Sequence, residues 1–194
     1  VFKSEITRKW CVIFPGSDKT VTFRSQLYNY NFKDERPAQI KTYFMMPLLH
    51  IFFVAIMGAI IFALSKFKFG RSMLKSYPGL FSFGLFKEGG PTREQMKDSS
   101  FTMVFWAEGW KDKLDISEQH TEPPNKRMKV VLTAPDMAYI TTAICLVNSG
   151  IVCLKEKEKM PGSGGVMTPG AAFQDTTLLE RLQKSGMEYT IMEK

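Results

Sequence analysis

An uncharged apolar stretch from Met45 to Leu64, MMPLLHIFFVAIMGAIIFAL, is the feature of this sequence that most constrains its fold. The stretch has 20 residues, of which one is a histidine and none is charged. A helix of about 20 apolar residues is long enough to cross the hydrocarbon core of a bilayer, which is about 30 Å thick. Pro47 lies near its start, where a proline costs no helical hydrogen bond. The stretch therefore predicts a helix that associates with lipid.

The large apolar residues of this stretch are the ones expected to contact lipid. They are Leu48, Ile51, Phe52, Phe53, Val54, Ile56, Ile60, Ile61, Phe62 and Leu64. Basic residues follow at Lys66, Lys68 and Arg71, a pattern typical of a helix flanked by anionic headgroups. The phenylalanine-rich run from Leu80 to Phe86 is too short to span and suits an interfacial or re-entrant segment. Spanning, lying in one leaflet or on oil, and burial as the central helix of a large domain all remain open for residues 45–86.

The chain as a whole has the composition of a globular protein, with one domain and appendages. Its 194 residues are 44% hydrophobic and 23% charged, which excludes a disordered, collagen-like or disulfide-scaffold chain. The first residue is Val1 and no signal-peptide pattern follows it, so we expect a piece of a longer chain.

Charge, cysteine and histidine exclude several classes of partner. The net charge of +7 is densest just after the apolar stretch, not in a stripe with interleaved aromatic residues, so we expect no nucleic acid partner. Cys145 and Cys153 lie in an apolar run and are predicted to be buried thiols, which with Cys11 favours a reducing compartment. The two histidines, His50 and His120, have no ligand-spaced partners, so no metal site is predicted.

Upstream of the apolar stretch, three elements are expected. Trp10–Phe14 has the composition of a strand, and Pro15-Gly16 ends it. Ser17 or Asp18 is a candidate N-cap for a helix over about Thr20–Lys33, which Arg36-Pro37 terminates. Ala38–Met45 is predicted to be a strand that leads into the apolar stretch.

Downstream, helices and strands alternate, so the fold class is predicted as α/β or α+β without internal repeats. First come a helix over Thr92–Asp98 capped by Thr92 and Gln95, a strand over Phe101–Trp110, a polar loop over Lys111–Lys126 and an antiparallel strand over Met128–Thr133. A long helix is expected from Pro135-Asp136 to Leu154. The helix LLERLQKSG, with a Thr177–Glu180 capping box and a stop at Gly186, precedes a final strand over Met187–Ile191. The long helix should turn Met137, Ile140, Ile144, Val147, Ile151 and Leu154 toward the core, and Glu156 should end it in solvent. A second membrane span is the alternative for this helix.

The motifs that carry chemistry are weak in this chain. The glycine-rich run GSGGVMTPG, Gly162–Gly170, has no strand before it and its helix starts late, so it is better explained as a tight connector than as a phosphate cradle. GxxxxGK[ST], HExxH and GxSxG are absent from the sequence. Asp136, Glu108 and Asp175 are each explained by a cap or a loop, so the catalytic residues stay unknown.

The order of several segments resembles a known family. The segments are FPGSD at Phe14–Asp18, YPGLFSFGLFKEGGPTREQ at Tyr77–Gln95, SSFTMVFWAEGW at Ser99–Trp110, TAPDMAYITTA at Thr133–Ala143, GGVMTPGAAF at Gly164–Phe173, and the terminal LLERLQKSGMEYTI. Nearly the whole chain resembles the C-terminal half of saccharopine dehydrogenase-like oxidoreductases of the animal, lipid-droplet-associated type.

The resemblance implies a domain plan. An N-terminal Rossmann domain, which lies outside this chain, would bind NAD(P), and this chain would bind no cofactor itself. Residues 1–44 and 87–160 would form the second, non-nucleotide domain, a mixed sheet with helices. Residues 45–86 would be an inserted lipid-associating segment, and residues 161–194 would pack back on the Rossmann domain. The joint between the domains would contain Gly164, Gly165, Thr168, Pro169 and Gly170.

The resemblance also implies partners and a location. A lipid droplet or an intracellular membrane, approached from the cytosol, and the chain's own Rossmann domain are expected partners. A homodimer is a further expectation, because the second domain of related lysine-pathway reductases supplies dimer contacts and binds substrate. No matching arginine pattern for a substrate carboxylate is found here, which favours a lipid-like substrate or no turnover.

Three functions follow as hypotheses. The first is an NAD(P)-dependent oxidoreductase on a lipid surface. The second is a non-catalytic lipid-droplet or membrane-associated protein that retains the enzyme scaffold. The third is a small integral membrane protein complete in itself. An intact glycine fingerprint after a strand in the upstream residues separates the first two, and cofactor binding by the full-length protein is the most informative measurement.

Overall fold

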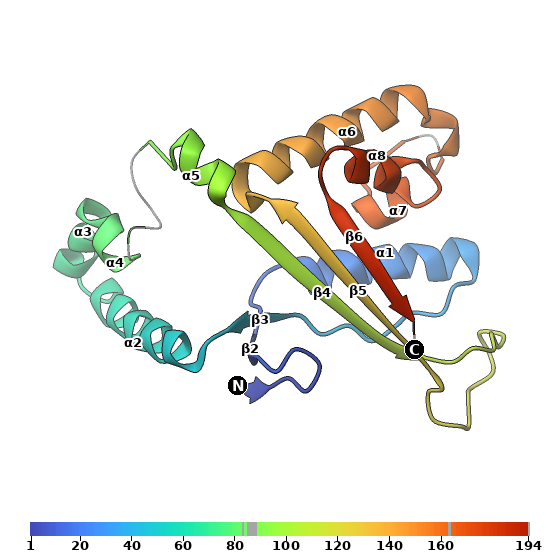
Figure 1. Ribbon diagram of the computed structural model, residues 1–194, viewed down its shortest axis with the longest axis horizontal. Coiled ribbons are helices and arrows are strands. Elements are labelled where there is room, and N and C mark those ends of the chain that lie inside the picture. The colour runs from blue at the N-terminus through green and yellow to red at the C-terminus, as the bar shows by residue number, and fades with distance from the viewer. Residues whose placement is uncertain (83, 85–88, 163, 194) are drawn as a thin grey trace. The chain divides into compact units, whose positions relative to one another are not determined.

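A computed structural model describes residues 1–82, 84, 89–162 and 164–193 (Figure 1). The chain divides into two compact units. Unit 1 consists of Val1–Lys19 and Ile40–Pro91, and unit 2 consists of Thr20–Gln39 and Thr92–Lys194. The chain therefore leaves unit 2 after Gln39 and rejoins it at Thr92.

Unit 1 contains a small antiparallel sheet with the order β1-β2-β3. The strands are β1 (Phe2–Lys3), β2 (Trp10–Ile13) and β3 (Tyr43–Met46). Cys11 pairs with Met45 and is buried. The strand expected over Trp10–Phe14 is confirmed. The strand expected over Ala38–Met45 was too long, because the four residues of β2 pair only with Tyr43–Met46.

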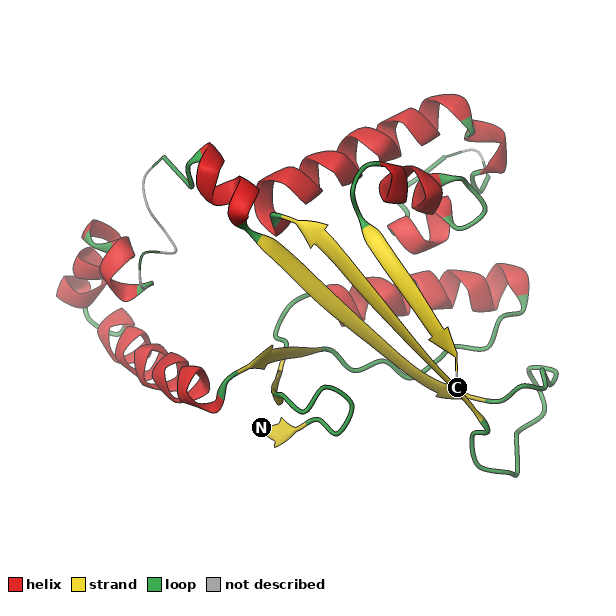
Figure 2. Ribbon diagram, viewed as in Figure 1, coloured by secondary structure: helices red, strands yellow, loops and turns green. Residues whose placement is uncertain are grey.

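Three helices follow the sheet in the described part of unit 1 (Figure 2). They are α2 (Leu48–Ser65), α3 (Lys68–Ser76) and α4 (Pro78–Phe81). The predicted apolar helix is confirmed, but it begins after Pro47, because Met45 and Met46 pair with β2. Part of the run Leu80–Phe86, namely residues 83, 85 and 86, lies outside the described residues.

Unit 2 contains the second sheet, which is also antiparallel and has the order β4-β5-β6. Its strands are β4 (Ser100–Gly109), β5 (Lys126–Pro135) and β6 (Glu188–Glu193). Val130 in the central strand lies opposite Phe105 on one side and Ile191 on the other. All three strands predicted here are confirmed. The chain is thus a mixture of α and β structure as expected, but its strands form two antiparallel sheets instead of one mixed sheet.

The expected helices of unit 2 are present, and α1 begins in unit 1, but the short helices over Lys157–Lys159 and Pro169–Phe173 were not predicted. The helices of this unit are α1 (Asp18–Lys33), α5 (Arg93–Asp98), the π-helical turn η1 (Met137–Thr141), α6 (Thr142–Lys155), the 3-10 turn η2 (Lys157–Lys159), α7 (Pro169–Phe173) and α8 (Leu178–Lys184). The capping box of α5 is present, with Thr92 and Gln95 exchanging hydrogen bonds. Gly186 ends α8 with φ +100°, as predicted.

The predicted core face of the helix formed by η1 and α6 was partly wrong. Val152 is fully buried, whereas Met137, Val147 and Leu154 are exposed. The face that packs inward instead includes Cys145, whose thiol contacts the Met187 sulfur at 3.8 Å. Apolar periodicity missed this face because its polar and small side chains suit the approach of α8 and the start of β6.

The predicted cap of α8 was also wrong. The Thr177 side chain does not cap its own helix; its hydroxyl bonds the Glu156 carboxylate, which also accepts from the Thr177 backbone N–H at 3.0 Å. Glu156 was expected in solvent but is buried. A distant carboxylate thus replaces Glu180 at this helix start.

Candidate functional site

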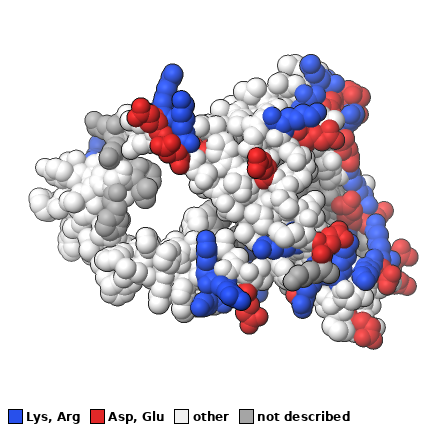
Figure 3. Space-filling model, in the orientation of Figure 1, with Lys and Arg blue, Asp and Glu red and all other residues white. Residues whose placement is uncertain are grey.

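Helix α2 presents the largest apolar feature of unit 1. None of its 18 residues, all of them described, is buried. Phe52, Val54 and Phe62 are 61%, 57% and 65% exposed, whereas Ile51 and Leu64 are half-buried. The surface over α2 and α3 in Figure 3 is almost free of Lys, Arg, Asp and Glu on the face in view. Apolar side chains in this number do not remain in contact with water.

Length and composition would let two described helices cross a membrane. They are Leu48–Ser65 and Met137–Lys155. The second helix belongs to unit 2, where Val152 is fully buried and Asn148 donates to the Ser185 hydroxyl at 3.2 Å. These contacts make α6 part of a folded unit, so α2 is the stronger candidate for lipid contact.

A tight corner joins α2 to α3. Gly70 is buried against the last turn of α2, and a Cβ added to it would lie 2.1 Å from the Leu64 carbonyl oxygen. The Arg71 guanidinium donates to the Ser65 carbonyl oxygen at 2.9 Å, which satisfies an acceptor at the end of α2. The corner requires glycine and is closed by a basic residue.

The predicted basic flank lies at this corner. The Lys66 ammonium lies 4.5 Å from the centre of the Phe62 ring, so its stem runs back along the apolar helix. Lys68 is exposed, whereas Arg71 is engaged with Ser65. Phe67 and Phe69 alternate with these residues and are 67% and 78% exposed. Cationic and aromatic groups are thus interleaved, as at a headgroup boundary.

The predicted joint residues lie in unit 2, where part of them packs on α1. The Ser25 and Thr168 hydroxyl oxygens are 2.6 Å apart. A Cβ on Gly170 would lie 2.8 Å from the Ser25 hydroxyl oxygen, so only glycine fits there without displacing Ser25. Pro169 starts α7, and the adjacent Ala171 is 2% exposed. The segment is therefore closely packed on α1 from Thr168 onward.

The first glycines of the connector have a different role. Gly164 and Gly165 have φ values of +100° and +133°, and a Cβ on either would meet nothing within 4 Å. Within this chain these two positions require glycine for its backbone conformation, and their place in the domain joint stays a prediction. Val166 beside them is 98% exposed.

Two further contacts extend the packing of this segment along α1. The Asn29 amide donates to the Gln174 side chain at 2.9 Å, and the Lys33 ammonium forms an ion pair with Asp175 at 2.5 Å. Ser25, Asn29 and Lys33 are spaced four residues apart, so one face of α1 receives the part of the segment from Thr168 to Asp175.

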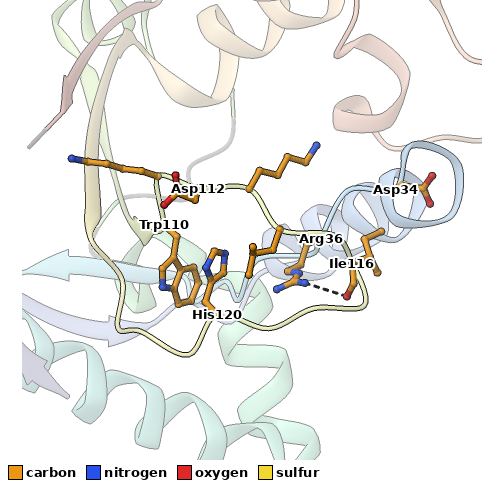
Figure 4. Close-up of a pocket in the computed structure, with 9 residues that line it drawn as sticks. Asp34, Arg36, Trp110, Asp112, Ile116 and His120 are labelled. Carbon is orange, nitrogen blue, oxygen red and sulfur yellow. Dashed lines mark hydrogen bonds between the residues drawn. The ribbon is translucent and has the colours of Figure 1, made fainter.

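A shallow pocket of about 230 Å³ lies between the end of α1 and the loop that joins β4 to β5 (Figure 4). The Trp110 and His120 rings stack in parallel, with centres 4.3 Å apart. The Arg36 guanidinium donates to the carbonyl oxygens of Asp115, Ile116 and Glu118. Sequence reasoning took Arg36 only as a helix terminator and the loop only as polar. The structure shows that this loop is bonded to the segment that follows α1.

The carboxylates considered from sequence have structural partners. Asp136 accepts from the Tyr139 and Ile140 backbone N–H groups at 2.6 and 3.2 Å, and the Tyr139 bond is the main cause of its lowered pKa. Its predicted role as a cap is confirmed. Glu108 pairs with Arg127 across the β4–β5 ladder at 3.1 Å. Among the described residues, no three His, Cys, Asp or Glu side chains could together hold a metal ion.

The predicted environment of the cysteines needs one correction. Cys153 is exposed and Cys145 is only half-buried, although burial raises the pKa of the Cys145 thiol. Both lie on α6, where the apolar run around them faces outward on one side. All three cysteines are free.

Comparison with known proteins identifies relatives along most of the chain. The chain is 31% identical to the saccharopine dehydrogenase-like oxidoreductase of Rattus norvegicus over 204 residues, covering 99% of this chain and 47% of the rat protein. It is 32% identical to the Homo sapiens protein of that name over 184 residues, covering 94% and 42%. It is 33% identical to the lipid droplet localized protein of Caenorhabditis elegans over 183 residues, covering 93% and 42%.

No family model matches the chain, and no solved structure matches it. The relatives agree with the resemblance carried by the sequence segments, and the chain spans about half the length of the curated relatives it matches. The chain therefore belongs to the saccharopine dehydrogenase-like oxidoreductases.

Proposed function

We propose that this chain is the second, non-nucleotide part of an NAD(P)-dependent oxidoreductase that is held on the surface of lipid droplets. The family supports the oxidoreductase class, and the name of the C. elegans relative supports the location. The observation that carries the lipid part is the exposure of α2, an uncharged helix of 18 residues, none of which is buried.

The proposal assigns separate roles to the two units. Helix α2 and the basic, aromatic corner after it hold the protein on lipid. The segment from Gly164 to Phe173, which packs on α1 from Thr168 onward, forms the joint with a nucleotide-binding domain supplied by the rest of the protein. That domain supplies the hydride carrier when the cofactor is bound.

Cofactor titration tests this proposal. Full-length protein should bind NADPH or NADH, whereas this chain alone should bind neither, because the glycine fingerprint expected of the family lies outside it. Binding is read from the nicotinamide fluorescence, with heat-unfolded protein as the control. Cofactor binding by the isolated chain would contradict the division of roles. Full-length protein that reaches droplets but binds no cofactor would instead indicate the non-catalytic scaffold.

A further inference from the structure

We propose that residues between Gln39 and Thr92 enter lipid from one aqueous side and return to that same side, so that α2 inserts through one leaflet without reaching a second aqueous side. The leaflet we assign is the phospholipid monolayer over an oil core. This inference rests on the proposed function, because it takes α2 as the lipid anchor, and it adds the topology of that anchor.

The two flanks of α2 are connected to each other. The part of the chain before α2, Thr20–Gln39, and the part after it, Thr92–Lys194, belong to one folded unit. Side-chain contacts hold them together: Ser25 with Thr168 at 2.6 Å, Asn29 with Gln174 at 2.9 Å, Lys33 with Asp175 at 2.5 Å, and Arg36 with the Asp115 carbonyl at 2.6 Å. Polar contacts of this kind form on one side of a membrane, so both flanks of the apolar segment lie there.

The part of the chain between α2 and Thr92 leaves too little length for a second crossing of a bilayer. A segment whose ends lie on the same side crosses a bilayer an even number of times. Between Ser65 and Thr92, the described residues form only α3, with 9 residues, and α4, with 4. The ten residues from Ser82 to Pro91 are too few for a spanning helix, which needs about 17–25. A lone extended strand would leave its backbone groups unpaired in hydrocarbon. A return crossing is therefore not available.

The corner between α2 and α3 lies directly at the end of α2. Gly70 approaches the Leu64 carbonyl so closely that no side chain fits, and Arg71 bonds the Ser65 carbonyl. The chain is thus turned sharply where α2 ends. Basic residues lie on both flanks of α2, with Lys41 before it and Lys66 and Lys68 after it. Because both flanks carry positive charge, neither flank is favoured to cross to the far side of the membrane.

The length of α2 favours a monolayer over oil instead of one leaflet of a bilayer. Eighteen helical residues extend about 27 Å at about 1.5 Å per residue, whereas one leaflet supplies about half of a 30 Å core. Helix α2 has no charged side chain along its length and so no face suited to water. An oil core beneath a monolayer offers apolar depth beyond one leaflet. This surface accommodates α2 without bringing it to an opposite layer of headgroups.

Cysteine accessibility in the full-length protein tests the topology. K41C and S76C place reporters on the two flanks at exposed positions, and native Cys153, which is exposed in unit 2, reports the side of the folded unit. I56C places a reporter in the middle of α2. Each is read separately on sealed microsomes and on isolated droplets, with a membrane-impermeant maleimide before and after detergent and with the other reactive cysteines replaced.

The expected result is labelling of K41C, S76C and Cys153 to the same extent before detergent, with I56C labelled only after it. If one flank on microsomes is labelled only after detergent while I56C is protected, α2 spans and this inference is overturned. If I56C is labelled before detergent as readily as the flanks, α2 is not in lipid and the proposed function fails instead. R93C, at an exposed position after the segment, replaces S76C if that variant does not fold.

Discussion

At the scale of single residues, Glu156 joins the end of α6 to the start of α8. Its carboxylate accepts hydrogen bonds from the Thr177 hydroxyl and backbone N–H, and it pairs with Lys159 at 3.2 Å and with Arg181 at 3.4 Å. The hydroxyl of Thr177 is the largest cause of a pKa lowered from 4.5 to about 2. A buried carboxylate with this many donors stays ionised at neutral pH.

This site predicts a pH dependence of stability. Because the folded pKa lies below the unfolded value, the unfolded chain takes up the proton first as the pH falls. The Glu156 contribution should therefore be complete above about pH 4.5 and be lost as the pH falls toward 2. Glu156→Gln should lower the urea midpoint of unit 2 at pH 7 and remove part of the fall between pH 4.5 and 2. The exposed neighbour provides the matched control, Glu158→Gln. Equal pH profiles for wild type and Glu156→Gln would contradict the assignment.

At the scale of elements, the corner between α2 and α3 depends on one glycine. A methyl group at Gly70 would meet the Leu64 carbonyl oxygen at 2.1 Å and its carbon at 2.8 Å, and both are backbone atoms that cannot rotate away. The corner would have to open, which would separate Arg71 from the Ser65 carbonyl.

Gly70→Ala is therefore expected to destabilise the corner by about 1–3 kcal/mol, the usual cost of overpacking. Hydrogen exchange of the Arg71 and Phe67 amides, measured on full-length protein bound to lipid, reports that loss. Gly58→Ala is the matched control, since a Cβ there meets nothing within 4 Å. Unchanged protection in Gly70→Ala would show that the corner is not closed in lipid.

Elements of this chain were predictable where the local pattern decides the structure. The strand over Phe101–Trp110, the capping box at Thr92 and the stop at Gly186 depend on neighbouring residues, and all three are confirmed. Features that depend on distant partners were not predictable. Thr177 prefers Glu156, 21 residues away, to its neighbour Glu180.

The candidate site shows the same limit. Hydropathy was sufficient to find α2, but nothing local indicates that Gly70 closes a corner or that Arg36 fastens the 110–125 loop. Cys145 and Asn148 contact Met187 and Ser185, which lie between α8 and β6. The inward face of α6 was misassigned because these two residues of α6, Cys145 and Asn148, are less apolar than the exposed Val147 and Leu154. The neighbour, not the helix's own hydropathy, selects the buried face.

At the scale of the whole molecule, an apolar segment is inserted into the sequence of a folded unit. The fold of unit 2 is tied through α1, so the segment is bounded on both sides by the same structure. Attachment to lipid should then be hydrophobic. Burying one Leu, Ile or Phe side chain contributes about 1.5–3 kcal/mol, whereas each basic residue near an anionic surface adds only about 1 kcal/mol.

Flotation of the full-length protein with lipid droplets tests this central claim most directly. Wild type should float even at about 1 M salt, where the Debye length is only about 3 Å. The triple variant Ile51→Asp, Val54→Asp, Ile61→Asp should sink, since an acidic residue at a helix centre costs about 2.5–3.5 kcal/mol in lipid. The alanine triple at the same positions should float, and replacing Lys66, Lys68 and Arg71 by Gln should only weaken flotation. Release of wild type by salt alone, or flotation of the aspartate triple, would contradict the account and indicate that α2 is covered by protein.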